Sequence, residues 1–240
     1  MTSGVGAFST LVIWNYHRVL EMQNIGGPSQ TRDTIDVTSH DSPNAFREFV
    51  AGPASGGEIS IEGNFLKGNA DGQIALHADV QGGTKRTAWI VAPMVAGGAW
   101  TFEAIAKGFD LTYPHEDKIG VSGSLQVTGK PDFFTPQSAG ISALAGIEQT
   151  GGSALVITPA PAAGVYAYAC TVNTASTWVK LTVTAAAHTI KVQGETQTTG
   201  VQGGEIALDA AGTTTEIFIM AYEAAKSPRL YVLTVTRPSP

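Results

Sequence analysis

The stretch at residues 25–58 most constrains what this chain can fold into. It is rich in Ser, Thr, Asp, Asn and Pro, whose side chains compete with regular backbone pairing. Loops of this length in compact domains are usually functional or disordered. This one is neither repetitive nor like-charged, and five large apolar residues interrupt it: Ile35, Val37, Phe46, Phe49 and Val50. Such side chains favour burial, so we expect a long loop that contacts a partner surface.

The composition describes a globular, weakly charged protein rich in β-structure. Apolar residues make up 43% of the 240 residues and charged residues 14%, which excludes a disordered chain. The 28 glycines and the abundant Thr, Val and Ala are typical of short strands joined by turns. The net charge of −6 argues against binding to nucleic acid through phosphate neutralisation. It is compatible with a protein that DNA slides past without sticking.

The chain is expected to divide near residue 138 into two domains, residues 1–138 and 139–240. Residues before this point hold 9 Lys and Arg against 14 Asp and Glu, whereas the remainder holds 5 against 6. The join contains Gly129, Pro131 and Pro136, a composition typical of a linker. Both parts have ordinary domain lengths.

In the first domain, five segments predict strands and one predicts a helix. The expected strands are residues 11–16, 57–65, 86–91, 99–113 and 118–128. Two of them alternate apolar and polar residues, which indicates a sheet with one covered face. Residues 69–80 predict the helix, because Asn69 or Asp71 can cap its start and Gly82 and Gly83 can end it. The pattern predicts a β-rich domain with the helix over an end or a face.

In the second domain, about seven short strands separated by turn residues predict an Ig-like β-sandwich. The expected strands are residues 153–158, 165–172, 178–184, 189–193, 205–208, 216–221 and 230–236. Cys170 is the one cysteine, which excludes both the disulfide of an antibody-type domain and a CxxC metal knuckle. It is expected to be a small buried hydrophobe in a strand.

The polar stretch contains residue types that occur in catalytic and metal sites. Ser39, His40 and Asp41 are the three types of a hydrolase triad, but a triad is assembled in space and neighbouring side chains point apart. A polar turn is the alternative. Asp33, Asp36 and Asp41 have the ligand type of a Ca²⁺ site without the spacing of an EF-hand. Caps for local turns are the alternative there.

Elsewhere the sequence offers no recognised catalytic motif. His115, Glu116 and Asp117 lie between two expected strands after Pro114, which favours a solvated turn over an acid–base site. There is no P-loop, no GxGxxG after a strand, no HExxH and no GxSxG. We therefore expect a protein that is not an enzyme, and we nominate no catalytic residue, cofactor or metal ligand.

Five segments, in order along the chain, carry a resemblance to a known family. They are TRDTIDVTSHDSPNAFREFVAG, GGEISIEGNF, DGQIALHADV, WTFEAIAKGFDL and DKIGVSGSLQVTGKP. Residues 5–137 thereby resemble the major tail tube proteins of long-tailed bacteriophages. The resemblance implies a β-sandwich or barrel with one helix, and hexameric rings that stack into the hollow tube conducting DNA into the host. It also implies assembly in the host cytoplasm, residence in the virion tail, and contacts with tail tip, tail terminator and tape measure proteins.

The resemblance gives the polar loop a role. The loop is expected to reach a neighbouring subunit or the adjacent ring. Ile35, Val37, Phe46 and Phe49 are then candidates for inter-subunit contact, since interfaces concentrate a few large buried side chains. The alternative is that these residues fold back on their own core.

The resemblance also gives the acidic balance a role. Glu103 and Asp110 lie on an expected strand and are candidates to face the lumen of the tube. A lumen that bound phosphate tightly would slow the passage of DNA. A neutral or acidic lining is therefore expected.

Residues from about 141 resemble the cadherin-like or bacterial Ig-like β-sandwich modules appended to phage structural proteins. The matching segments are ALAGIEQTGGSALVITP, VYAYACTV, KVQG, EIALDAAGTTTEIFIMAYE and LYVLTVTRP. The resemblance implies a module on the outside of the tail, for which binding to cell-surface glycans is suggested. Trp178, Tyr166, Tyr168 and Tyr222 would either stack on sugars or fill the sandwich core. The alternative function is a carbohydrate-binding or adhesion protein of a virion or cell surface, and neither function inserts the chain into a membrane.

Overall fold

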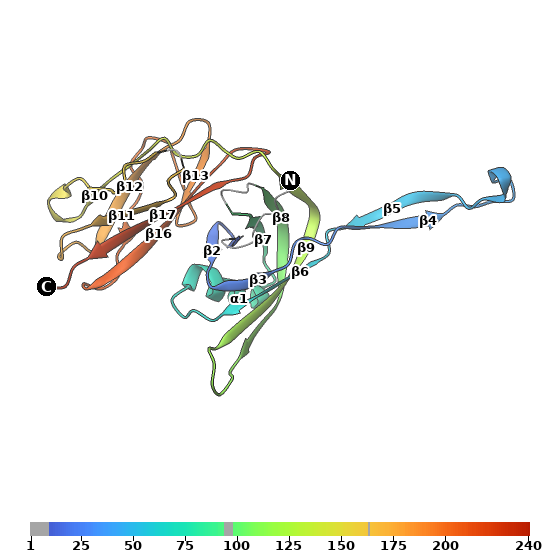
Figure 1. Ribbon diagram of the computed structural model, residues 1–240, viewed down its shortest axis with the longest axis horizontal. Helices are drawn as coiled ribbons and strands as arrows, with labels where there is room; N and C mark the ends of the chain where they lie inside the picture. Colours follow the sequence, from blue (N-terminus) through green and yellow to red (C-terminus); the bar gives the residue numbers. More distant parts are fainter. Residues whose placement is uncertain (1–9, 94–97, 163) are drawn as a thin grey trace, which may run out of the picture.

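The computed structural model describes residues 10–93, 98–162 and 164–240. The N-terminal part is built on a seven-stranded sheet with the order β2-β1-β7-β8-β9-β6-β3, in which all neighbouring strands are antiparallel (Figure 1). Its strands are β1 (Leu11–Trp14), β2 (His17–Val19), β3 (Met22–Ile25), β6 (Glu58–Asn64), β7 (Lys85–Val91), β8 (Ala99–Thr112) and β9 (Gly120–Phe134). The five strands expected in this part are confirmed, and β2 and β3 are additional.

One face of this sheet packs on the helix. A π-helical turn, Ala70–Ile74, leads into α1, Ala75–Gly82, where the sequence predicts a helix. The Asn69 side chain caps the start by accepting a hydrogen bond from the Gln73 N–H at 2.8 Å, and Gly83 ends the helix with a φ of 62°. Leu76 points into the apolar core formed with the sheet. α1 therefore covers the sheet face that the alternating strands present.

A buried polar contact fixes α1 to the sheet. The Asp79 side chain is 9% exposed and accepts a hydrogen bond from Trp14 Nε1 at 2.7 Å. Arg86 on β7 donates to both carboxylate oxygens of Asp79, at 2.9 Å from Nη2 and 3.0 Å from Nε. This one carboxylate therefore joins α1, β1 and β7.

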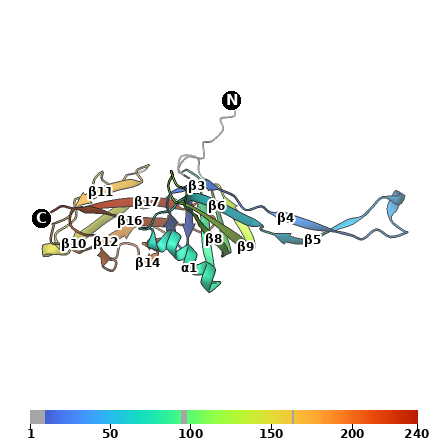
Figure 2. The same ribbon diagram turned by 90° about the horizontal axis from the view of Figure 1, so that it is seen from below.

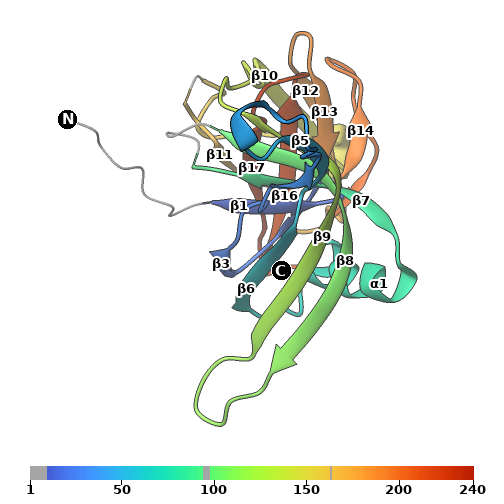
Figure 3. The same cartoon turned by 90° about the vertical axis from the view of Figure 1, so that its right-hand side faces the viewer.

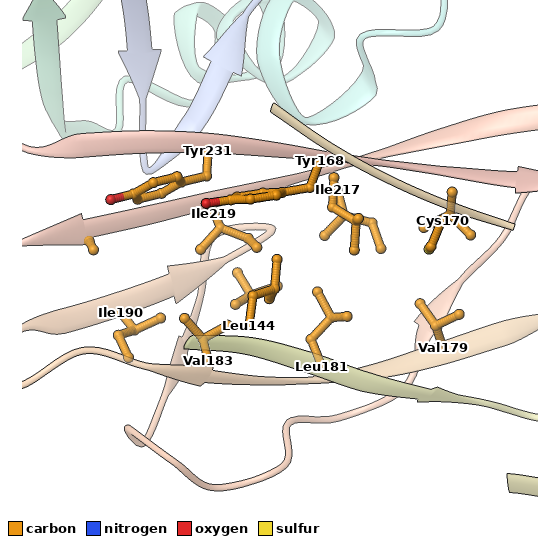
Figure 4. Packing of buried hydrophobic residues seen from close by; sticks show 14 of the residues in the cluster. Leu144, Tyr168, Cys170, Val179, Leu181, Val183, Ile190, Ile217, Ile219 and Tyr231 are labelled. Atoms are coloured by element: carbon orange, nitrogen blue, oxygen red, sulfur yellow. The ribbon is translucent and has the colours of Figure 1, made fainter. Parts of the chain in front are cut away.

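The C-terminal part is a sandwich of two sheets, ordered β10-β12-β15 and β11-β17-β16-β13-β14. The strands are β10 (Ala143–Glu148), β11 (Ala167–Thr171), β12 (Trp178–Thr184), β13 (Thr189–Val192), β14 (Glu195–Gln197), β15 (Ile206–Ala207), β16 (Thr213–Tyr222) and β17 (Arg229–Arg237). Leu181, Ile190 and Ile217 are fully or almost fully buried between the sheets (Figure 4). The prediction of a mainly β chain with one α-helix and a C-terminal β-sandwich is confirmed for the described residues.

Six of the seven strands expected in the C-terminal part are present, and one expectation is wrong. Residues 153–158 form only isolated bridges, at Ala154 and Thr158, and no strand. β10 and β14 lie outside the expected segments. Cys170 is 5% exposed on β11, as expected, and burial raises the pKa of its thiol to about 11.

A third apolar cluster joins the two parts, which lie side by side in Figures 1 and 2. Its buried members are Ile13, Trp89, Val91 and Ala99 from the seven-stranded sheet and Phe218, Met220 and Leu230 from β16 and β17. We call this set the junction cluster. The junction cluster covers the sheet face opposite α1 near β1 and β7, so the C-terminal sandwich is docked on the sheet.

The polar stretch at residues 25–58 forms a β-hairpin where the sequence predicts a loop. β4 (Thr31–Asp36) pairs antiparallel with β5 (Phe49–Ser55) in a two-stranded sheet of its own. We call residues 31–55 the arm. The arm projects away from both sheets and ends in a short 3₁₀ turn at Pro43–Ala45 (Figures 1 and 2), and Figure 3 views it end-on. Thr31, Asp33, Thr34 and Asp36 lie within β4 itself, so their tendency to form turns does not prevent pairing with β5.

None of the helices in the described ranges is long and apolar enough to cross a membrane.

Candidate functional site

The arm is the most exposed ordered element among the described residues. Every residue of β4 is exposed, and on β5 only Gly52 is buried. Arg32 Nη1 donates to the Gly52 carbonyl oxygen at 3.0 Å, next to the point where the register shifts between Arg32 and Thr34. A two-stranded hairpin is marginally stable in water by itself. The arm therefore presents surface without the support of a third strand.

The four candidate contact residues all lie on the arm and expose their side chains. The exposed fraction is 51% for Ile35, 45% for Val37, 74% for Phe46 and 54% for Phe49. The neighbouring Val50 is 47% exposed. The alternative that these residues fold back on their own core does not describe this structure.

The polar residues at the end of the arm form local turns. Asp36 Oδ1 accepts a hydrogen bond from the Thr38 N–H at 2.9 Å, and hydrogen bonds from Thr38 lower the pKa of Asp36. Ser42 Oγ donates to Glu48 at 2.8 Å, and Ser39 Oγ accepts from the Asp41 N–H at 3.3 Å. Asp36 and Ser39 thus cap turns, which was the alternative to catalysis or metal binding. In the described parts of the chain, no group of three or more His, Cys, Asp or Glu residues could hold a metal ion.

The two lumen candidates share the polar face of the seven-stranded sheet. Glu103 and Asp110 are both exposed residues of β8, on the face opposite α1. Their neighbours across the strands on this face are Thr87 and Ser122, respectively. Both candidates therefore lie on the same exposed sheet face, on which the apolar Ile105 lies between them.

The part of this face from Glu103 to Asp110 carries four carboxylates and two lysines, and Asp132, which lies beyond it, is paired with Lys130. Lys85 Nζ lies 2.5 Å from Glu103 Oε2, and Lys107 Nζ lies 2.7 Å from Glu58 Oε2. The hydrogen bond from Lys107 lowers the pKa of Glu58. The remaining carboxylates of this part are Glu62 and Asp110, which flank Ser122 on neighbouring strands. This part of the face is therefore acidic, with half of its carboxylates paired to lysine.

The structure brings together Ser138, His188 and Glu223, a set that sequence spacing gave no means to find. Ser138 Oγ lies 2.8 Å and Glu223 Oε1 lies 2.9 Å from the same ring nitrogen, Nε2 of His188. A hydrolase triad needs the serine and the acid on opposite ring nitrogens, and Ser138 is fully buried. The cluster instead holds the linker, since Glu223 accepts a hydrogen bond from the Ala139 N–H.

The aromatic candidates for sugar stacking are largely occupied by packing. Tyr168 is 3% exposed and lies in the core of the sandwich, as Figure 4 shows. Tyr222 stacks on Tyr16 at the junction with the N-terminal sheet, at 6.1 Å between ring centroids, and burial raises its pKa to about 12. Tyr166 packs against Tyr231, and Trp178 lies under the Lys180 ammonium group at 4.7 Å.

His115, Glu116 and Asp117 lie in the exposed turn between β8 and β9, which is the arrangement expected of a solvated turn. His115 Nδ1 is 3.9 Å from Glu116 Oε1, and both side chains are more than 90% exposed. An acid–base site needs a pocket that shifts its pKa values. These residues provide none.

Chains from solved structures of tail-like particles match roughly half of this chain. A chain in "Virion of native gene transfer agent (GTA) particle" is 18% identical, with 54% of this chain and 98% of that chain covered and a TM-score of 0.46. A chain of the anti-feeding prophage baseplate is 12% identical, with coverage of 56% and 97% and a TM-score of 0.46. The SPP1 tail tube protein is 17% identical, with coverage of 54% and 78% and a TM-score of 0.43. No curated protein sequence matches the chain.

Family models match both parts of the chain. The model described as "Cadherin-like beta sandwich domain" matches residues 152–238, which form most of the C-terminal sandwich. The model described as "Lambda phage tail tube protein, TTP" matches residues 2–134, more than half of the chain, and this range contains the seven-stranded sheet, α1 and the arm. The chain therefore belongs to the lambda phage tail tube protein family, and it is a structural component of a phage tail that carries an additional cadherin-like β-sandwich.

Proposed function

We propose that identical copies of this chain form six-membered rings that stack into the hollow tail tube, and that the arm makes contacts between copies. The observation that carries the proposal is the arm itself. It extends from the fold with Ile35, Val37, Phe46 and Phe49 exposed, in a member of a tail tube family. Large apolar side chains on a marginal hairpin gain stability when a partner covers them. In a homopolymer that partner is another copy.

We also propose that the polar face with Glu103 and Asp110 lines the lumen. Four carboxylates on this face repel the phosphate groups of DNA, and the two lysines are held by carboxylates at 2.5 and 2.7 Å. A lysine in such a pair offers less charge to phosphate than a free one. DNA would then pass without binding, while the tape measure protein fills the lumen before ejection and the tip and terminator proteins close the two ends.

In this proposal the chain works as two modules, residues 1–138 and 139–240. The first builds the tube, and the second is exposed beside it. Because the second module docks on the face opposite α1 near β1 and β7, the proposal requires that only the part of this face beyond the junction cluster lines the lumen. Binding of cell-surface glycans is not part of the proposal, because Tyr168 is buried and Tyr222 packs at the junction. The other two candidates, Tyr166 and Trp178, are both half-buried, and each packs against a neighbouring side chain.

Electron microscopy of the purified chain tests the assembly. We expect regular hollow tubes or six-membered rings in negative stain as the protein concentration rises. The association should persist in high salt, because it is driven by the apolar surface of the arm. Salt screens interactions between charges and does not weaken the burial of apolar surface. A chain that stays monomeric at all concentrations would contradict the proposal.

The lumen assignment is tested by the size of a reagent that can reach position 110. The thiol of Cys170 is buried and has a raised pKa, so an introduced cysteine reacts selectively. In tubes of Asp110→Cys, a small maleimide should react, whereas a maleimide on a large dextran should react at least tenfold more slowly. The control is Val156→Cys on the C-terminal module, where the side chain is 80% exposed and both reagents should react. Equal reaction of Asp110→Cys with both reagents would place this face outside.

A further inference from the structure

The sequence of β5 differs from that of a strand with one covered face. In β6, Ile59 and Ile61 are buried and alternate with the exposed polar residues Glu58, Ser60 and Glu62. In β5, the residues Phe49, Val50 and Ala51 are consecutive and apolar. Consecutive apolar residues occur in strands that are buried on both faces. The arm therefore carries the pattern of a doubly buried strand while both of its faces are exposed.

The register of the hairpin assigns these side chains to faces. Ile35 is paired with Val50, so both point to one side, which we call face one. Asp36 is paired with Phe49 and Thr34 with Ala51, and these four point to the opposite side, face two. Successive residues of a strand alternate between faces.

The ladder continues beyond the last paired residues of the two strands. The Val37 N–H donates to the Glu48 carbonyl oxygen at 2.9 Å, which adds Val37 to face one. Face one thus has three apolar side chains, Ile35, Val37 and Val50, that are 51%, 45% and 47% exposed. Face two has Phe49, which is 54% exposed, and the exposed Ala51.

No part of the described chain covers either face. The hairpin is a separate two-stranded sheet, and Figures 1 and 2 show it extending beyond the rest of the molecule. The side-chain contact that ties its base to the body runs from Gln30 Nε2 to the Pro131 carbonyl oxygen, at 3.4 Å. Both faces are therefore available to other molecules along the whole length of the arm.

The same chain carries a second exposed apolar site that such an arm can meet. Tyr113 is 71% and Ile119 is 39% exposed, and they follow and precede the paired residues Thr112 and Gly120 at the end of β8 and β9. The arm of one copy can contact the site at Tyr113 and Ile119 of the next copy, which is a head-to-tail contact. Contacts of that type generate rings or filaments, which fits a second copy of this chain as the occupant.

We infer that each arm inserts between two other copies of this chain, with one copy against face one and the other against face two. The inference rests on the proposed function and sharpens it, because an arm lying on a single surface would leave either Val50 or Phe49 exposed. It also explains why the hairpin needs no third strand of its own: its neighbours supply the missing layer on each side.

Val50 and Ala51 provide a matched pair for the test, because they are adjacent in the chain and lie on opposite faces. Val50→Cys and Ala51→Cys should both react with maleimide before assembly. After assembly into tubes, both should react at least tenfold more slowly. Val156→Cys, on the exposed surface of the C-terminal module, is the control that should react equally in both states. Cys170 adds no background because its thiol is buried.

The outcomes separate the inference from the proposed function. Tubes in which only one of the two cysteines is protected would leave the proposed function standing and overturn the inference. Tubes in which neither is protected would overturn any role of the arm. A chain without cysteine substitutions that forms no tubes would overturn both. Should a cysteine variant fail to fold, Val50→Lys and Ala51→Lys replace it, and each is expected to reduce tube formation at least tenfold.

Discussion

A chain that ends at residue 138 is expected to be poorly soluble and strongly destabilised, even though it retains the entire seven-stranded sheet. Truncation uncovers the N-terminal half of the junction cluster, in which Ile13 and Val91 are 0% and Trp89 is 6% exposed. Burial of one such side chain contributes about 1.5–3 kcal/mol, so the loss reaches at most about 5–9 kcal/mol. The whole stability of a domain is about 5–15 kcal/mol. The sequence alone suggests thinner but intact tubes when residues 141–240 are removed, and the junction cluster changes that expectation.

The measurement is the soluble yield and unfolding temperature of the truncated chain beside the full chain. A matched control carries the same truncation with Ile13→Thr, Trp89→Thr and Val91→Thr, which keep strand propensity while removing the apolar surface. The control should recover solubility. The contrary result is a truncated chain, without these substitutions, that is soluble and unfolds at the temperature at which residues 1–138 unfold in the full chain. Docking would then add no stability.

Asp79→Ala is expected to lower the free energy of unfolding by about 3 kcal/mol. This value is at the low end of the range for breaking a buried ion pair, because the Arg86 side chain is about one-third exposed. The substitution leaves Trp14 Nε1 and the Arg86 guanidinium without their acceptor. Denaturant unfolding measures the change. The double variant Asp79→Leu with Arg86→Met removes both charges and should recover much of the loss. If the double variant is less stable than Asp79→Ala, the buried charge is not the cause.

The same carboxylate predicts a pH dependence. Burial alone would raise the pKa of Asp79, but hydrogen bonds from Arg86 and Trp14 and the Arg86 charge outweigh it and lower the pKa. A carboxyl group whose pKa is lowered by folding stabilises the protein above its unfolded pKa, near 3.8, and this stability is lost as the pH falls through the folded value. As the pH falls from 5 to the acid limit of folding, the free energy of unfolding should therefore decrease less for Asp79→Ala than for the unsubstituted chain.

Much of the fold could be predicted because its signals are local. β12 occupies the same residues, 178–184, that its alternating pattern predicts, and Asn69 caps the helix as its position suggests. Strands that alternate have one buried face, and a helix with a capping residue has a fixed start. These features depend on neighbours in the sequence.

The arm and the junction were harder to predict, for different reasons. The hairpin of β4 and β5 was hidden by the polar residues in β4 and in the connection, although the run Phe49-Val50-Ala51 carried a strand signal, whereas the junction depends on partners distant in the sequence. The junction cluster also left a signal, in the continuous apolar runs of β1 and β7, residues 11–14 and 88–91. Such runs predict strands covered on both faces. What covers the second face is decided by β16 and β17, more than 120 residues away.

The contact residues and the lumen residues are both defined by the assembled tube and not by the single chain. The structure places Ile35, Val37, Phe46 and Phe49 on one exposed arm, and Glu103 and Asp110 on one polar sheet face. Which of these surfaces meets another copy is a property of the assembly, and a single chain carries only the shapes and charges that permit it. These assignments therefore stay predictions.

The central claim is that the arm joins copies of this chain into a tube. Electron microscopy of the intact chain beside a chain without the arm tests it most directly. Thr31 and Ser55 are paired at the base of the arm, so residues 32–54 can be replaced by an Asn-Gly turn that closes the hairpin there. The shortened chain should fold, with the far-ultraviolet circular dichroism spectrum of a β-rich protein. It should form no tubes under conditions in which the intact chain does. Tubes of the shortened chain as long and as regular as those of the intact chain would contradict the claim.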